Sequence, residues 1–441
     1  MNDLAPTAKK SMAVIGGGIL GMTLALRLRQ AGHDVDLFEA APDFGGLASP
    51  WNLGEFTWDK YYHVTLLSDS HLRGLLEELG LETETEWVET RTGFYTGGQL
   101  HSMSNSLEFL RFPPLGLIDK FRLGATIFYA SKIKNWKRLE KINVCDWLRK
   151  LSGKRTFEKI WLPLLKAKLG SNYDKVSAAF IWAIIARMYA ARRSGLKKEM
   201  FGYVRGGYRK VLGEFVELLQ KQEVGLEAGQ AVSSVSRRNG KIEVDGESGL
   251  LGRYDDVAVT LPAPVASRIC EGLTDEERLR LNGISYQGIV CASVVLRKPV
   301  AGFYVTNITD EWVPFTAVIE MSALVDPDSA FEGNSLIYLP KYVPRGDDFF
   351  DSSDEEIQEE FTTALLKMYP HLSKSDIVAF RVARASDVHA LSVPGYSETL
   401  PPRKTSVPGL HIVNSAHIVN GTLNVNETIA LAERAASELA A

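Results

Sequence analysis

Three glycines near the start of the chain have the spacing of a loop that holds phosphate groups. Gly16, Gly18 and Gly21 form a GxGxxG pattern between an apolar stretch and a helix-forming stretch. The first glycine permits a tight turn, the second lets backbone approach a pyrophosphate, and the third lets the helix pack closely on the strand. The N–H groups at the helix start, including those of Ile19 and Leu20, would face the phosphates. The pattern therefore predicts a dinucleotide-binding loop.

A carboxylate disfavours NADP in this site, and a second glycine loop favours FAD over NAD as the dinucleotide. Glu39 ends the second apolar stretch, where a carboxylate accepts hydrogen bonds from ribose hydroxyls and repels the 2′-phosphate of NADP. The next residue, Ala40, is expected to contact the cofactor too. A second loop follows that can reach the pyrophosphate and ribityl chain of a longer cofactor, and it comprises Gly45, Gly46, Leu47 and Ala48. The alternative is that a glycine turn before a helix is only a turn.

These loops need a particular arrangement of secondary structure around them. Residues 12–15 predict a buried strand, residues 20–30 predict a helix that stops at Gly32, and residues 33–38 predict a second strand. This order makes a βαβ unit, which predicts a parallel sheet with a right-handed crossover.

The order of helix-rich and strand-rich stretches predicts two interleaved domains. Residues 113–198 are mostly helix-forming, strand-forming stretches lie on both sides of them, and a strand at 408–413 and a helix at 428–439 end the chain. We expect an α/β fold class in which a Rossmann-type FAD-binding domain is interleaved with an α+β substrate domain. The expected FAD-binding domain comprises residues 1–65, 200–265 and 395–441, and the expected substrate domain comprises residues 66–199 and 266–394.

Composition and charge argue against several classes of protein. The 441 residues are 45% hydrophobic and 24% charged, with a net charge of −4, so nothing in the charge balance favours nucleic acid as a partner. The three cysteines form no CxxC pair, which predicts neither a metal site nor a disulfide framework and fits a reducing cytoplasm. The apolar run at 178–190 is interrupted by Arg187 and too short to span a membrane, so we expect a buried helix there.

Several further segments resemble one superfamily of flavoproteins, in the order in which that superfamily has them. Residues 146–170 resemble its helical stretch, residues 202–208 resemble the segment that returns to the flavin domain, and residues 260–262 match its TxP strand end. Together with the glycine loops they resemble the flavin-containing amine oxidase superfamily, in particular its protoporphyrinogen-oxidase-like branch with the phytoene desaturase relatives. The resemblance spans nearly the whole chain. It departs from the family at Leu47, where the second loop usually has arginine.

The resemblance also implies cofactor contacts in the second half of the chain. It places backbone contacts to adenine at Val232 and a strand end beside the cofactor at Thr260. The family usually has Gly-Asp at the last strand end, where this chain has Asn414 and Ser415, which bring no charge. The start of the last helix is expected against flavin N1 and O2, where a helix dipole stabilises reduced flavin, through Leu423, Asn424 and Val425. The alternative is a plain loop with an Asn or Thr cap.

The same resemblance implies an FAD-dependent oxidoreductase that moves a hydride between flavin N5 and an apolar or extended substrate. Alignment with monoamine-oxidase-type strands puts Cys291 where those enzymes have lysine, which speaks against amine oxidation. A small buried strand residue is the simpler interpretation of Cys291. His63, in a polar-aromatic cluster with Asp59, Tyr61 and Tyr62, is the catalytic candidate, with His389 and His417 behind it, although a lone histidine is usually structural.

Three other functions stay open at this point. One is an amine oxidase. A second is a redox-neutral flavoenzyme of the UDP-galactopyranose mutase type, which shares the fold and a GGL second loop. The third is a flavin-binding subunit without activity, because the arginine and the aspartate of the family pattern are missing.

A basic stretch with interleaved aromatic residues suggests one kind of binding partner. Residues 120–141 contain seven Lys and Arg residues around Phe128, Tyr129 and Trp136, and more basic residues follow at 192–198. Such a face can rest on an anionic lipid surface, or it can be solvated charge beside a core helix. We expect a small, apolar substrate, no nucleic acid partner, and a cytoplasmic protein that is peripheral to the membrane if the lipid interpretation holds.

Overall fold

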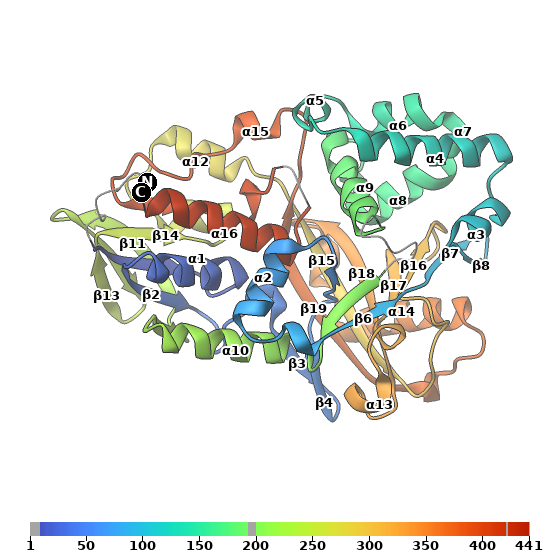
Figure 1. The fold of residues 1–441 in the computed structure, drawn as a ribbon, viewed down its shortest axis with the longest axis horizontal. Helices are drawn as coiled ribbons and strands as arrows, with labels where there is room; N and C mark the ends of the chain where they lie inside the picture. Colours follow the sequence, from blue (N-terminus) through green and yellow to red (C-terminus); the bar gives the residue numbers. More distant parts are fainter. Residues whose placement is uncertain (1–8, 193–199, 420–421, 441) are drawn as a thin grey trace.

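The computed structural model describes residues 9–192, 200–419 and 422–440, and it arranges them around two large sheets and a block of helices (Figure 1). The expected basic residues Arg193, Lys197 and Lys198 lie outside the described residues. The predicted α/β class is confirmed. The domain limits expected from the sequence stay a prediction.

A five-stranded sheet, at the left in Figure 1, contains the predicted βαβ unit. Its strand order is β10-β2-β1-β14-β20, and every neighbouring pair is parallel. The order brings the two ends of the chain into one sheet. The strands are β1 (Ser11–Ile15), β2 (Asp34–Glu39), β10 (Gly225–Ala228), β14 (Asp256–Val259) and β20 (Leu410–Ile412).

Both faces of the parallel sheet are covered, which explains why its strands are apolar at consecutive positions. In β1, Met12 and Val14 pack against helices on one face, whereas Ala13 and Ile15 pack against strands and helices on the other. The first face carries α1 (Ile19–Gln30), α2 (Ser70–Glu78), α10 (Gly207–Lys221) and α16 (Val425–Leu439). The second carries β11 (Val232–Arg238), β12 (Lys241–Gly246), β13 (Gly249–Tyr254), α11 (Ala263–Ile269) and α12 (Asp275–Asn282).

A seven-stranded sheet of order β19-β15-β18-β17-β16-β7-β8 forms the centre of the second half of the molecule. One face packs against α14 (Asp354–Met368). The other face contributes Tyr338 of β18 to an aromatic cluster, in which it packs with Trp58 and Tyr62. The strands are β7 (Thr92–Thr96), β8 (Gln99–Ser102), β15 (Tyr286–Leu296), β16 (Val305–Ile308), β17 (Ala317–Glu320), β18 (Ser335–Pro344) and β19 (Ile377–Ala390).

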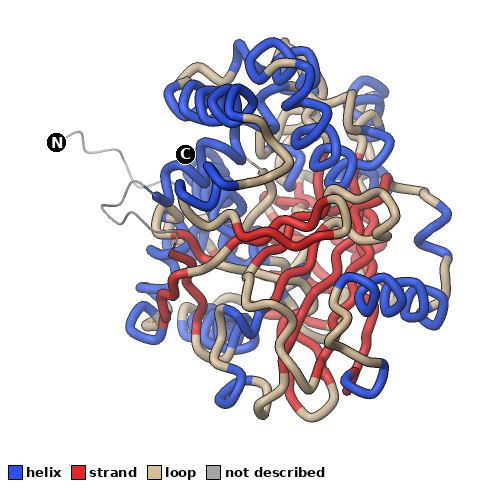
Figure 2. Tube along the Cα trace, turned by 90° about the vertical axis from the view of Figure 1, so that its right-hand side faces the viewer, coloured by secondary structure: helices blue, strands red, loops and turns tan. Residues whose placement is uncertain are grey.

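The expected helical stretch folds as a block beside this sheet, and Figure 2 shows its helices above the strands. It comprises α3 (Ser106–Arg111), α4 (Leu117–Lys132), α5 (Lys137–Glu140), α6 (Val144–Ser152), α7 (Lys154–Thr156), α8 (Leu162–Leu169) and α9 (Ala178–Arg192). Phe180 and Ile181 of α9 are buried in the core of the block, as expected for the apolar run. Among the described residues, no helix combines the length and the apolar character needed to cross a bilayer.

Short elements join these parts. They are β3 (Pro50–Leu53), β4 (Phe56–Asp59), β5 (Thr65–Leu66), β6 (Thr85–Glu89), β9 (Met200–Val204), α13 (Pro327–Ala330) and α15 (Tyr396–Thr399). β9 lies between β5 and β6 in a small sheet, and it leads directly into the turn before α10. The chain therefore passes from the helical block back to the parallel sheet through this small sheet.

Candidate functional site

The first glycine loop brings helix α1 unusually close to the end of β1. Gly16 has a φ of +109°, which favours glycine. A Cβ on Gly21 would lie 1.8 Å from the carbonyl oxygen of Gly16, so only glycine permits this approach. Gly18 is the N-cap of α1, and no side chain caps the helix there. The helix start, with Ile19 and Leu20, thus presents backbone N–H groups and the positive end of the helix dipole to any anion beside it.

The second glycine loop lies directly against the first. The Gly45 N–H donates to the Gly17 carbonyl at 2.8 Å, and a Cβ on Gly46 would lie 3.1 Å from the Gly18 Cα. Leu47, at the position where the family has arginine, is 38% exposed, whereas Ala48 is buried. The two loops therefore form one backbone surface without side chains at Gly18 and Gly46, which is the shape that a pyrophosphate needs.

Glu39 directs its carboxylate at the first loop. Oε2 accepts a hydrogen bond from Gly17 N–H at 2.6 Å, and Oε1 accepts one from Ala41 N–H at 2.8 Å. Each carboxylate oxygen keeps a further acceptor position for a ribose hydroxyl. The Glu39 carbonyl accepts from Gln230 N–H at 2.9 Å, which holds the segment before β11, and with it Val232, beside the carboxyl end of β2. Ala40 is exposed at the same edge.

Two of the predicted residues hold the backbone of the site in place. The Thr260 hydroxyl lies 2.9 Å from the Ile15 carbonyl and 3.1 Å from the Gly16 carbonyl, so it fixes the turn after β1. Asn414 is 1% exposed. Its amide donates to the Leu261 carbonyl at 3.1 Å and accepts from Ala416 N–H at 3.1 Å. Ser415 follows it.

The last helix begins earlier than expected, at Val425. Asn424 is its N-cap and accepts from Glu427 N–H at 3.0 Å, and Leu423 packs against the core below α1. The plain-cap alternative places the cap at Asn426 or Thr428, but Asn426 instead accepts from His71 N–H at 2.9 Å and thereby joins α16 to α2. The structure thus has an asparagine cap at Asn424, earlier in the chain than that alternative has it, and the other backbone N–H groups of the first turn stay available.

These residues lie at or just after the carboxyl ends of strands of the parallel sheet. Gly16 follows β1, Glu39 ends β2, Thr260 follows β14, and Asn414 follows β20 closely. The strands are parallel, so their carboxyl ends meet at one edge of the sheet, where ligands bind in folds of this type. The structure brings the two glycine loops, Glu39, Thr260 and Asn414 to this edge. The glycine-lined backbone, the uncapped helix and the carboxylate together fit FAD.

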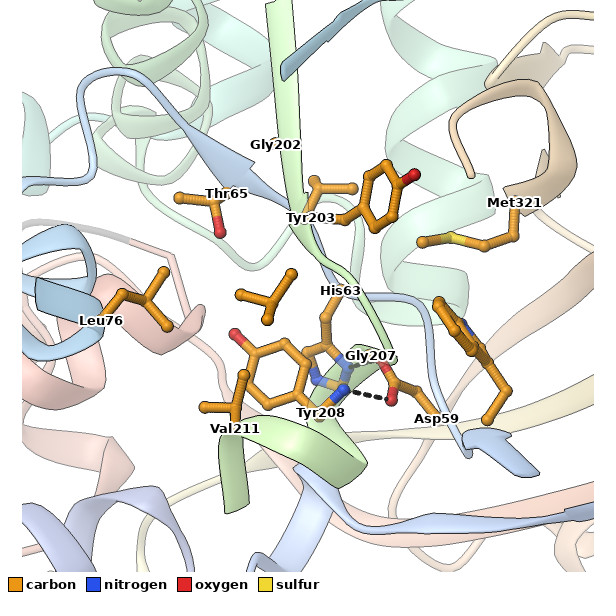
Figure 3. Close-up of a pocket in the computed structure, with 13 residues that line it drawn as sticks. Asp59, His63, Thr65, Leu76, Gly202, Tyr203, Gly207, Tyr208, Val211 and Met321 are labelled. Carbon is orange, nitrogen blue, oxygen red and sulfur yellow. Dashed lines mark hydrogen bonds and ion pairs between the residues drawn. The ribbon is translucent and has the colours of Figure 1, made fainter. Parts of the chain in front are cut away.

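The predicted His63 lies in a small pocket rather than at the glycine loops. Figure 3 shows His63, Asp59 and Tyr208 together in this pocket. His63 Nδ1 lies 3.8 Å from Asp59 Oδ2, and its ring centre lies 4.8 Å from that of Tyr208. Asp59 is buried and accepts from Tyr208 N–H at 2.9 Å, so it caps α10. A catalytic role for His63 stays a prediction.

Cys291 lies at the centre of β15 and is fully buried, in agreement with its simpler interpretation. It pairs with Pro340 on β18 and Ala383 on β19, and it belongs to one packed cluster with Tyr61, Tyr62 and Tyr338. Burial raises the pKa of its thiol, so the group is neutral at physiological pH. Strand β15 contains no lysine.

A pair of tyrosines beside Cys291 was not predicted as a unit. The Tyr62 and Tyr342 hydroxyls are 2.7 Å apart, and burial raises the pKa of Tyr62 well above its usual value. Tyr342 also lines a cavity of about 470 Å³ between α8 and the ends of β16 and β18. The Lys168 ammonium lies 3.9 Å from the centre of the Tyr342 ring. The pair thus joins an open cavity to the aromatic cluster.

Gln287 and His389 occupy paired positions of β15 and β19, and Gln287 Nε2 would lie 3.9 Å from a Cβ on Gly170, which lines this cavity. Gln287 is 1% exposed, and its Nε2, like Nε2 of His389, has no hydrogen-bond partner among the described residues. Asn172 Nδ2 donates to Gln287 Oε1 at 3.3 Å. Burial lowers the pKa of His389 to about 4. Buried polar atoms without partners mark a place where a ligand can supply them.

The fold and this edge of the parallel sheet define a dinucleotide-binding flavoprotein. Residues 21–440 match the family model described as flavin containing amine oxidoreductase. The chain belongs to this family, as the resemblance predicted, and it is an FAD-dependent oxidoreductase.

Curated relatives resemble this chain in sequence, and a solved structure resembles it in fold. Coproporphyrinogen III oxidase of Mycobacterium tuberculosis is 25% identical over 319 residues, which are 66% of this chain and 67% of that protein. Zeta-carotene desaturase of Zea mays is 21% identical over 465 residues, with 92% of this chain and 79% of that protein covered. The crystal structure of an oxidoreductase from Methanosarcina mazei superposes with a TM-score of 0.75 at 20% identity, over 97% of this chain and all of the other.

Proposed function

We propose that FAD lies along the carboxyl edge of the parallel sheet, with its pyrophosphate between the two glycine loops. The ribose would meet Glu39 and Ala40, and adenine would meet the backbone at Val232. The flavin end would meet the start of α16. The full set of proposed contacts is Gly16, Gly18, Ile19, Leu20, Gly21, Glu39, Ala40, Gly45, Gly46, Leu47, Ala48, Val232, Thr260, Asn414, Ser415, Leu423, Asn424 and Val425.

The proposed reaction is hydride transfer between flavin N5 and an apolar or extended substrate. When bound, FAD supplies hydride acceptance and donation at N5. The observation that carries the proposal is the half-buried tyrosine pair, Tyr62 and Tyr342, beside Cys291 on a strand without lysine. The named activities of the relatives, on a porphyrinogen and a carotene, support a substrate of this kind. The interleaved domain limits expected from the sequence are part of the same proposal.

The side chains around Cys291 would shape the substrate site and exclude water from it rather than exchange protons. Burial keeps the hydroxyl of Tyr62 and the thiol of Cys291 protonated. They can therefore donate hydrogen bonds but cannot act as general bases near neutral pH. Tyr342 connects this region to the open cavity, so the substrate would enter past its ring.

Anaerobic spectroscopy tests the proposal. The FAD-loaded protein is mixed with a reduced tetrapyrrole, a polyene precursor or a primary amine, and flavin absorbance is followed. We expect bleaching by one of the first two and none by the amine; bleaching by the amine alone would overturn the substrate assignment. Turnover that needs prior reduction without net electron flow would favour a mutase-type enzyme. A protein that cannot be loaded with FAD would indicate a non-enzymatic subunit.

Two tyrosine variants locate the substrate site. Tyr62→Phe should lower kcat/KM for the accepted substrate while leaving FAD content unchanged. Tyr254→Phe is the matched control, because its hydroxyl donates to Asp36 at 2.7 Å on the parallel-sheet side and lies away from the cavity. Equal effects of both variants on kcat/KM would argue against a substrate site at Tyr62.

A further inference from the structure

The cavity beside α8 lies where the seven-stranded sheet opens on one side of β18. Pairing between β18 and β17 ends at Tyr338, and one further backbone hydrogen bond follows on that side, from Thr316 N–H to the Pro340 carbonyl at 2.7 Å. Beyond Pro340 the strand keeps β15 as its neighbour. Residues 341–344 therefore have a strand on one side and the cavity, which they line, on the other.

The backbone of Tyr342 faces this cavity. Within a strand, residues two positions apart direct their N–H and carbonyl groups to the same side. The Pro340 carbonyl points to Thr316 and away from β15, so the backbone groups of Tyr342 also point away from β15, to the side that β17 does not reach. In agreement, the Tyr342 carbonyl would lie 3.9 Å from a Cβ on Gly170, which lines the cavity at the end of α8. The Tyr342 N–H is thus a hydrogen-bond donor at the cavity wall.

Two half-buried lysines lie on aromatic rings at this cavity. The Lys168 ammonium lies 3.9 Å from the centre of the Tyr342 ring, and the Lys341 ammonium lies 3.7 Å from the centre of the Phe349 ring. Neither ammonium has a carboxylate oxygen within 4.0 Å in the part of the chain that the structure describes. An ammonium that rests on a ring is partly desolvated, so an anionic oxygen beside it would be a strong partner.

The carboxylates in the cavity wall already have partners. Asp310 accepts from two glycine N–H groups in the turn between β7 and β8, at 2.7 and 2.8 Å. Glu311 forms an ion pair with Lys166 at 3.0 Å, and Asp347 accepts from Phe349 N–H at 3.0 Å. The carboxylates of the wall are therefore engaged, whereas the two lysines on the rings lack an anionic partner among the described residues.

A buried amide adds a donor without an acceptor. The Lys175 ammonium donates to Asn172 Oδ1 at 2.9 Å, which leaves the Asn172 amide nitrogen to donate to Gln287 Oε1 at 3.3 Å. These bonds orient the Gln287 amide, and its Nε2 has no partner among the described residues although Gln287 is 1% exposed. Nε2 would lie 3.9 Å from a Cβ on Gly170, so the bare backbone there leaves space between this donor and the cavity. A buried donor in this state costs free energy that an acceptor on a ligand would recover.

His389 connects the amide to the first of the two lysines. It pairs with Gln287 across β15 and β19. Burial, with a smaller contribution from the nearby Lys168 ammonium, lowers the pKa of His389 to about 4. The imidazole is therefore neutral near pH 7, and its buried Nε2 is a further polar atom without a partner among the described residues. The unmatched polar atoms thus gather on the side of the sheet where the Tyr342 ring meets Lys168.

We propose that this cavity holds a carboxylate of the substrate, and that the substrate is therefore an apolar molecule with an acidic end. The carboxylate would accept from the Lys168 ammonium, the Gln287 amide and the Tyr342 N–H. The apolar part would pass the Tyr342 ring toward the aromatic cluster around Cys291. The inference rests on the proposed function, because it names the substrate class of the same site. A hydrocarbon without oxygen would leave these donors unmatched.

Fluorescence titration of the FAD-loaded protein with two matched probes tests the inference. Pyrenebutanoate carries a carboxylate, whereas pyrenebutanol carries a hydroxyl on the same apolar group. We expect the acid to bind at least roughly tenfold more tightly than the alcohol, because hydrogen bonds to charged groups exceed those to neutral groups by about this factor. Lys168→Met should remove this preference, Lys168→Arg should keep it, and Gln287→Leu should reduce it. Equal affinities for the acid and the alcohol in the wild type would overturn the inference, as would a preference that survives in Lys168→Met.

Lys132→Met is the matched control. Lys132 is exposed on α4, its ammonium lies 5.0 Å from the centre of the Phe128 ring, and it does not line the cavity, so the same change there should leave both affinities unaltered. Circular dichroism and FAD content verify that the variants fold, and equal losses in Lys132→Met and Lys168→Met would overturn the inference. The titration needs no turnover, so its outcome is separate from that of the proposed reaction. Flavin bleaching by a hydrocarbon polyene without acid preference would overturn the inference and leave hydride transfer standing. Acid preference without bleaching by any substrate would support the acidic site and overturn the proposed reaction.

Discussion

Substitution of Gly21 by alanine probes the closest approach in the cofactor site. The new Cβ would lie 1.8 Å from the Gly16 carbonyl oxygen and 3.2 Å from the Thr260 hydroxyl. Contacts below 3.0 Å essentially never occur for real Cβ atoms, so α1 must move away from the turn by at least about 1.2 Å. Overpacking of this kind costs about 1–3 kcal/mol. The shift would also displace the N–H groups that would face the pyrophosphate in the proposed site, so FAD affinity and stability should fall together.

The control is the same change in another helix. Gly74 of α2 is exposed, and a Cβ there would meet nothing within 4 Å. Gly74→Ala should therefore raise the free energy of unfolding by about 0.5–1 kcal/mol and leave FAD binding unchanged. Denaturant unfolding of the apoproteins and fluorescence titration with FAD measure both quantities. A Gly21→Ala protein as stable as Gly74→Ala, with wild-type FAD affinity, would refute the reasoning.

Three further predictions follow from burial and charge. Glu39→Gln should weaken FAD binding by roughly tenfold or more, because a hydrogen bond to a charged group is worth about 1.5–3 kcal/mol; unchanged affinity in a fluorescence titration would contradict this role. Burial raises the pKa of all three cysteine thiols, so iodoacetamide should label the unfolded protein but not the native one at mildly alkaline pH. His389 has its pKa lowered to about 4 from the usual 6.5. The unfolded chain therefore binds the proton first, and the free energy of unfolding should fall as pH drops from 6.5 toward 4. His389→Gln should flatten this dependence in denaturant titrations.

The sequence predicts those parts of the site that are built from one short, continuous segment of the chain. The glycines and the βαβ unit around them lie within residues 11–39, so strand, turn and helix are all legible there. The second glycine loop is equally local, but its close approach to Gly18 was not predicted. The tyrosine pair is different, because Tyr62 and Tyr342 are 280 positions apart and meet only through the tertiary fold.

Strand β18 was missed because it contains Pro340 near its centre, and proline argues against a central strand. The Pro340 carbonyl accepts from Thr316 N–H at 2.7 Å. The backbone nitrogen of Pro340 points to the same side of the strand, toward the segment that contains Thr316. Regular pairing with β17 (Ala317–Glu320) has ended at that point, and the absent N–H leaves no ladder bond unmade. Strand β19 was missed because its burial pattern is mixed and it carries charges such as Arg381 and Arg384, as an edge strand can.

The most direct test of the central claim is a crystal structure of the protein with FAD bound. We predict electron density for the pyrophosphate between the Gly16–Gly18 and Gly45–Gly46 segments, with a ribose hydroxyl on Glu39 and the flavin ring at the start of α16. FAD bound elsewhere, or side chains filling this edge of the sheet while flavin is in excess, would contradict it.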